Sequence, residues 1–85
     1  MREVIEHILS VKPYKVELSI VDYQDEGIKL EVFLLDKEYQ VIEVFTATKD
    51  ENNSIDKLIQ FMNELHQKIQ DENIICECIN GIQKY

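Results

Sequence analysis

Residues 14–20 read Tyr-Lys-Val-Glu-Leu-Ser-Ile, and this alternation of apolar and polar side chains is the clearest structural pattern in the chain. Successive side chains of a strand point to opposite faces of a sheet, so the pattern predicts a half-buried strand. Residues 28–34 and 39–47 follow after short polar connections and also favour strands. Three consecutive strands with short connections predict an antiparallel meander.

Helical periodicity appears on both sides of this meander. Residues 2–10 carry one apolar stripe that predicts a short amphipathic helix, and Pro13 ends it. A second helix is expected to begin after Asn53, whose side chain would cap the free backbone N–H groups of the first turn. Asp56, three residues later, would accept the backbone N–H of Asn53 in return. Residues 71–73 end this helix. Its apolar stripe consists of Ile55, Leu58, Ile59, Met62, Leu65 and Ile69.

The C-terminal segment predicts one or two further strands. Residues 74–79 favour a fourth strand, and Asn80-Gly81 is a favoured pair for a two-residue hairpin turn, which makes residues 82–85 a short fifth strand. The whole order predicts a single α+β domain over residues 1–85, built as a two-layer sandwich with a mainly antiparallel sheet. The helices are expected to cover the even-numbered side chains of the first three strands, together with Ile74, Cys76 and Cys78.

The opposite face of the predicted sheet mixes charged residues with large apolar ones. The apolar members are Val21, Phe33, Leu35, Val41, Phe45, Ile75 and Ile79. A fully solvated face carries fewer large apolar groups, so either the first helix or the C-terminal segment covers it, or it binds a second copy or another protein. Phe33 and Phe45 are the candidate contact residues.

The charge balance limits the classes of partner. Seventeen acidic and 9 basic side chains give a net charge of −8, which repels phosphate backbones and anionic lipid and attracts basic protein surfaces. An alternative explanation is that the acidic side chains only keep the protein soluble and mark no partner. The helix, three-strand, helix order occurs in double-stranded RNA-binding domains as well, but residues 49–53, where those domains place basic residues, read Lys-Asp-Glu-Asn-Asn.

The acidic residues gather at the connections between elements. Candidate binding residues are Asp22, Asp25 and Glu26, Asp36 and Glu38, and Asp50 and Glu51, and a further pair is Asp71 and Glu72. Spaced carboxylates can take the place of phosphates in a cleft lined by Arg or Lys. The simpler interpretation is that turns are acidic because they are exposed to solvent. In a meander the first and third of these clusters are expected at the same end of the sheet.

The sequence offers weak material for chemistry. Cys76 and Cys78, together with His7 and His66, have the side-chain types of a four-ligand metal site. Zinc sites, however, usually place two to four residues between paired cysteines, and here only Glu77 separates them. Buried core thiols explain the cysteines better. We therefore expect no enzyme activity, no catalytic residue, no metal and no cofactor. Two thiols in an otherwise cysteine-free chain favour the reducing cytoplasm, and no apolar run reaches membrane-spanning length.

A resemblance completes the sequence reading. The helix at residues 2–9, the meander and the stretch Asn53-Ser54-Ile55-Asp56-Lys57-Leu58-Ile59 together make the chain similar in size, charge and element order to the small acidic phage anti-CRISPR inhibitors of RNA-guided DNA nucleases. The resemblance implies an inhibitor whose acidic side chains occupy a DNA-reading cleft. The tail at 74–81 departs from that family, and no functional residue is carried over.

Two hypotheses for function follow. The first is a non-enzymatic acidic protein that blocks a basic, nucleic-acid-handling surface of a partner protein. The second is a structural or regulatory interaction module that dimerises or docks through its semi-apolar sheet face.

Overall fold

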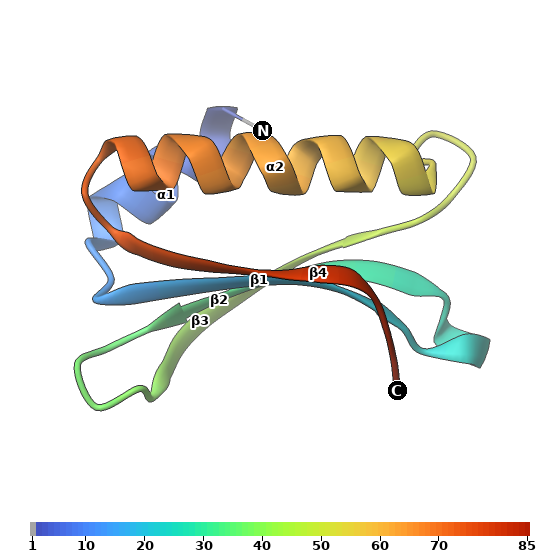
Figure 1. Cartoon of the computed structure of the whole chain (residues 1–85), viewed down its shortest axis with the longest axis horizontal. Coiled ribbons are helices and arrows are strands. Elements are labelled where there is room, and N and C mark those ends of the chain that lie inside the picture. Colours follow the sequence, from blue (N-terminus) through green and yellow to red (C-terminus); the bar gives the residue numbers. More distant parts are fainter. Residues whose placement is uncertain (1) are drawn as a thin grey trace.

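The computed structural model describes residues 2–85 and shows one α+β domain. The elements are α1 (Arg2–Val11), β1 (Lys15–Asp22), the 3-10 turn η1 (Gln24–Glu26), β2 (Ile28–Leu35), β3 (Val41–Thr48), α2 (Ile55–Asp71) and β4 (Ile75–Lys84). The four strands form one sheet in the order β3-β2-β1-β4. Both helices lie on the same side of it, which confirms the predicted two-layer sandwich (Figure 1).

The sheet is mixed. Strands β1, β2 and β3 form the predicted antiparallel meander, but β4 pairs with β1 in parallel. The long helix makes this pairing available, because 17 residues at about 1.5 Å each span about 25 Å, close to the length of an eight-residue strand. α2 thus returns the chain to the end of the sheet where β1 begins, and β4 starts there.

The core lies between the helices and the inner face of the sheet. The sheet side supplies the even-numbered residues that β1 and β2 were predicted to bury. Its members are Val16, Leu18, Ile20, Leu30, Val32 and Leu34, packed against Ile5 and Ile8 of α1 and Leu58, Met62, Leu65 and Ile69 of α2. As expected, Cys76 and Cys78 pack against this cluster.

The phase of strand β3, meaning which of its alternating side chains face the helices, is opposite to the one expected. Val32 pairs with Phe45 and Leu30 with Ala47, so the odd-numbered residues of β3 beyond the bulge, from Glu43 onward, face the helices. The prediction that Phe45 lies on the outer face is therefore wrong. A bulge between Leu34 and Leu35 in the β2–β3 ladder sets the phase, and apolar residues of both parities in β3 left it undetermined from the sequence.

The predicted hairpin at Asn80-Gly81 is also wrong. β4 continues as one strand to Lys84, and its ladder with β1 contains a bulge: from the Leu18–Cys78 pair to the Ile20–Ile82 pair, β1 advances two residues and β4 advances four. Gly81 adopts a φ of 82°, which suits a bulge as well as a turn. The predicted fifth strand is therefore the second half of β4.

The start of α2 differs from the prediction by one residue. Ser54, and not Asn53, is the N-cap, and its hydroxyl accepts the backbone N–H of Lys57 at 3.2 Å. At the other end Asn73 has a φ of 63°, the left-handed conformation that commonly ends a helix.

Candidate functional site

Strand β3 forms one edge of the sheet, and its outer side is exposed. Val41, Ile42 and Val44 are 55%, 49% and 44% exposed. The strand is eight residues long and contains no proline, glycine or lysine, the residues by which proteins usually protect a sheet edge. Within the described chain, β3 is therefore an unprotected edge of apolar, β-branched character.

The register shows which backbone groups of β3 are free to pair. The Lys49 N–H donates to the Ile28 carbonyl at 2.7 Å, and hydrogen-bonded pairs alternate along an antiparallel ladder. Phe45 and Ala47 consequently direct their backbone groups toward β2. Val44, Thr46 and Thr48 direct theirs away from the sheet, where a further strand would bind them.

The single charged residue of β3 is tied to the helix side. The Glu43 carboxylate contacts the His7 ring of α1, with Oε2 and Nε2 2.7 Å apart, and the His7 ring contacts Phe45 edge-on at a centroid distance of 5.4 Å. The outer edge of β3 therefore presents an uncharged strip.

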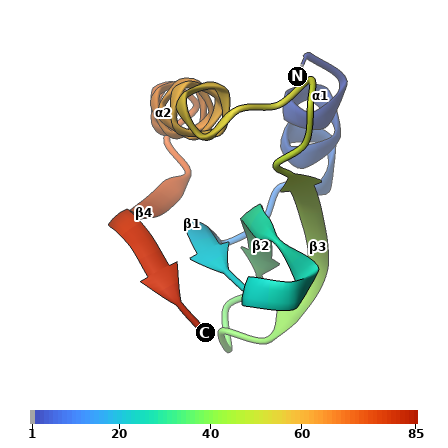
Figure 2. The same ribbon diagram turned by 90° about the vertical axis from the view of Figure 1, so that its right-hand side faces the viewer.

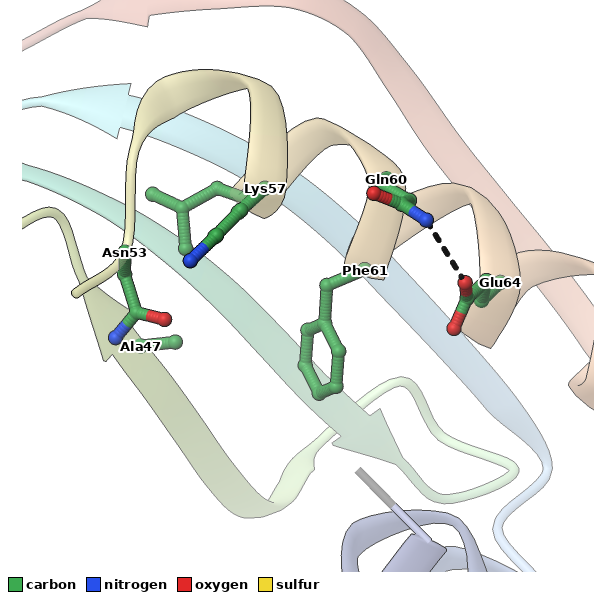
Figure 3. A pocket seen from close by; sticks show the side chains of 7 residues that line it. Ala47, Asn53, Lys57, Gln60, Phe61 and Glu64 are labelled. Carbon is green, nitrogen blue, oxygen red and sulfur yellow. Dashed lines mark hydrogen bonds between the residues drawn. The ribbon is translucent and has the colours of Figure 1, made fainter.

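A groove opens beside this edge on the helix side of the sheet. α1 is only ten residues long and covers one end of the sheet, while α2 runs along its whole length (Figures 1 and 2). The space left by α1 holds a groove of about 390 Å³. Its apolar surface comes from Ala47 of β3 and from Leu58 and Phe61 of α2, and its polar residues are Asn53, Lys57, Gln60 and Glu64. In Figure 3 Phe61 points from α2 into this space.

The opposite edge of the sheet is less suited to pairing. Ile75, Ile79 and Ile82 of β4 are exposed, but the bulge interrupts the strand in the middle and Lys84 stands at its end. A bulged edge with a terminal lysine resists the addition of another strand.

The outer face of the sheet is not covered by either helix. Phe33 is half-buried there, and Leu35 is only 5% exposed. Polar side chains form a network over the face. The Lys15 amine contacts Glu77 at 2.8 Å and Glu17 at 3.3 Å, and these contacts, chiefly the hydrogen bond to Glu77, raise the pKa of Lys15. The expected alternative in which the first helix covers this face is thus wrong, because α1 lies on the same side of the sheet as α2, and long side chains do part of the covering (Figure 2).

The acidic connections lie at both ends of the sheet. The β1–β2 connection, with Asp22, Asp25 and Glu26, lies at the same end as the β3–α2 connection, with Asp50 and Glu51, because Thr48 pairs with Lys29 and Lys49 bonds to Ile28. The expected grouping of the first and third clusters follows from this register. Asp36 and Glu38 lie at the opposite end.

Three of these aspartates stabilise their own turns. Asp22 accepts the Gln24 N–H at 2.8 Å, Asp36 accepts those of Glu38 and Gln40 at 2.9 Å, and Asp50 accepts those of Asn52 and Asn53 at 2.8 Å. Each is the first residue of a tight turn, where Asp closes the backbone on itself. Local structure therefore explains these three positions without a partner.

The structure does not assemble the candidate metal ligands. Cys76 and Cys78 lie on β4 beneath α2, His7 pairs with Glu43, and His66 belongs to α2. Among the described residues, no three His, Cys, Asp or Glu side chains are close enough together to hold a metal ion. Burial raises the pKa of Cys76 to about 12 and also raises that of Cys78, which favours the protonated, less nucleophilic form of both half-buried thiols.

Comparison with known proteins finds no matching protein family, no similar curated protein and no similar solved structure. Neither helix within residues 2–85 has the length and apolar character needed to cross a lipid bilayer.

The edge of β3 and its groove are features that the sequence reasoning missed. The available signal was the break in alternation at Val41-Ile42 and Val44-Phe45, where adjacent apolar residues point to opposite faces. Such a strand has no purely solvated side.

Proposed function

We propose that this chain is a non-enzymatic protein-binding domain that docks partners along strand β3. The observation that carries the proposal is the exposed edge itself, where Val41, Ile42 and Val44 are 44–55% exposed beside outward-pointing backbone groups. An unpaired strand edge binds an extended segment through main-chain hydrogen bonds, and side-chain pockets add specificity. The groove beside Ala47 supplies such a pocket.

A matched pair of charge substitutions tests this proposal. Val44 and Ile75 are both exposed, both lie on the outer face, and stand at opposite edges of the sheet, with Val44 paired to Phe33 and Ile75 to Lys15. With the full chain as bait in its native host, Val44→Asp should reduce capture of the partner roughly tenfold, because it places an unpaired charge in the contact. Ile75→Asp should leave capture unchanged. Equal retention by both variants contradicts docking on β3.

A second candidate function is supported by the grouping of the acidic connections. Five carboxylates stand at the Thr48 end of the sheet, together with Lys49 and with the amine of Lys57, which donates to the Asn52 carbonyl at 2.9 Å. Such a cluster would block a basic, nucleic-acid-handling surface of another protein, in the manner of the anti-CRISPR inhibitors that the chain resembles in size, charge and element order. Three of the seven candidate acidic residues already hold turns, so this function ranks second.

Salt separates the two functions. Binding that rests on the acidic ends weakens steeply as ionic strength rises, whereas docking on an apolar strand edge weakens little. The affinity of the captured partner, measured at low salt and again at about 0.5 M salt, distinguishes them.

A further inference from the structure

Building on the proposed docking along β3, we infer that the occupant is an extended segment of a partner protein that pairs with β3 as a new edge strand and carries lysine or arginine beyond the Thr48 end. The segment alternates apolar side chains along its central part.

The backbone of β3 calls for a strand. Val44, Thr46 and Thr48 point their N–H and C=O groups outward at every second residue, which is the spacing that another strand satisfies and a helix does not. Side chains of the added strand that face the helices would lie beside Phe45 and Ala47. There they reach the groove formed with Phe61.

The distribution of charge selects a basic segment. Asp22, Asp25 and Glu26 stand by one connection at the Thr48 end, and Asp50 and Glu51 in the other. Lys49 and the amine of Lys57, which donates to the Asn52 carbonyl at 2.9 Å, offset two of these five charges, so the end stays acidic. A strand added beside β3 lies roughly 10–15 Å from the β1–β2 connection, at about 4.8 Å per strand, and closer to the β3–α2 connection. That distance exceeds the screening length of about 8 Å at physiological salt, so the carboxylates of the β1–β2 connection attract a basic flank mainly at low salt, and the nearer Asp50 and Glu51 contribute most at physiological salt.

The same charges disfavour a second copy of this chain. Each copy carries a net charge of −8. Antiparallel pairing of two β3 edges would bring the acidic Thr48 end of one copy against the end of the other that carries Asp36 and Glu38. Like charges placed together at both ends oppose this contact.

Synthetic peptides test the inferred occupant. One peptide has a central run of alternating valine and threonine with lysines on both flanks, and its control has the same centre with glutamates on the flanks. Backbone amide exchange of the whole chain is followed by NMR at neutral pH and low salt. With the lysine peptide, the amides of Val44, Thr46 and Thr48 should gain protection, while those of Phe45 and Ala47, already bonded to β2, should change little. The glutamate peptide should bind at least roughly tenfold more weakly.

Proline provides the matched variant. Thr46→Pro removes an outward N–H and leaves the β2–β3 ladder intact, so it should abolish binding of the lysine peptide in a folded chain. Thr46→Val retains the N–H and should bind like the wild type. Unchanged circular dichroism of both variants shows that neither result comes from unfolding.

Each other outcome overturns the inference. Equal binding of the two peptides would show that charge does not select the segment. If about 1 mM lysine peptide protects none of the β3 amides from exchange, a basic strand does not bind there. Protection of Val44 and Thr46 that rises with protein concentration alone identifies a second copy as the occupant. In that case docking on β3 stands and only the basic partner fails, whereas the proposed function itself fails when Val44→Asp captures the host partner as well as the wild type does.

Discussion

Tyr23 anchors one end of the uncovered sheet face through a single strong contact. Its hydroxyl donates to Glu31 Oε2 at 2.6 Å, its ring lies 4.9 Å from that of Tyr85, and the Lys29 amine lies 5.7 Å from its centroid. The hydrogen bond to the Glu31 carboxylate is the largest cause that raises the pKa of Tyr23 to about 12, and loss of solvent contact adds to it. The phenol is thus held in its protonated form.

We predict that one tyrosine of the folded chain ionises near pH 12. A raised pKa means that the folded state retains the proton, so the stabilisation is fully present below the ordinary pKa of 10.0 and disappears as the pH rises through about 12. Ultraviolet titration of the native chain should show this late step. Tyr23→Phe and Glu31→Gln should both remove it, whereas Tyr39→Phe should leave it in place.

Cys76 shows how burial controls reactivity at the scale of one residue. Its thiol packs against the core, and burial is the first cause that raises its pKa from 9.0 to about 12. The raised pKa lowers the thiolate fraction near pH 8, so alkylation of native Cys76 by iodoacetamide should be much slower than alkylation of the unfolded chain, as followed by mass spectrometry.

Replacing the cysteines checks their structural role. Cys76→Ala combined with Cys78→Ala should lower the free energy of unfolding by about 1–2 kcal/mol without abolishing partner binding. A content of about one zinc ion per purified chain would contradict this interpretation.

At the scale of the element, the first turn of α2 depends on Ser54. We predict that Ser54→Ala lowers the free energy of unfolding by about 1 kcal/mol, because the Lys57 N–H loses its acceptor. Asn53→Ala should change it much less, since Asn53 contributes no cap to the helix. Urea denaturation of both variants measures the difference, and a larger effect at Asn53 would restore the cap that the sequence suggested.

Periodicity predicted the elements of this fold better than their pairing. β1 as far as Ile20 and the first half of β2 alternate apolar with polar residues, so their inner residues, such as Val16 and Leu30, followed directly from the sequence. β3 does not alternate, and its phase depends on a bulge beside the Asp36 turn that no pattern specifies. Asn80-Gly81 is compatible with a hairpin turn and with a bulge. Pairing of β1 with residues on both sides of Gly81 determines that it forms a bulge.

The phase of β3 gives a prediction that compares two adjacent residues. Phe45 faces α1 and the half-buried space beside the core, whereas Val44 faces outward. Phe45→Glu should therefore lower the free energy of unfolding by about 2–3 kcal/mol, because it places a carboxylate beside Glu43 and removes an aromatic contact with His7. Val44→Glu should have an effect below about 1 kcal/mol.

Denaturation curves for these two variants measure the phase directly. A larger loss for Val44→Glu would reverse the assignment of the two faces. Because Phe45 supports the fold, a change of assembly in Phe45→Glu does not report on the outer face, and Phe33 is the proper probe of that face.

At the scale of the whole molecule, net charge compensates for an unprotected edge. A long, apolar edge strand without proline or lysine is an aggregation site, and the segment Val41–Thr48 carries one acidic residue. The net charge of −8 opposes the approach of a second copy near neutral pH. We therefore expect repulsion between whole molecules, more than the sequence of the strand, to oppose self-association of this chain.

We predict that the chain is monomeric near pH 7 and associates through β3 as the pH approaches its isoelectric point of about 4.6. The carboxylates lose charge over this range, so repulsion falls while the apolar edge is unchanged. Light scattering across the pH range should show association of the wild type and of Thr46→Val. Thr46→Pro should remain monomeric to lower pH, because it lacks the outward N–H that a paired edge requires. Circular dichroism distinguishes association from acid unfolding, and equal association of the proline variant would assign the contact to the outer face around Phe33 instead of the β3 edge.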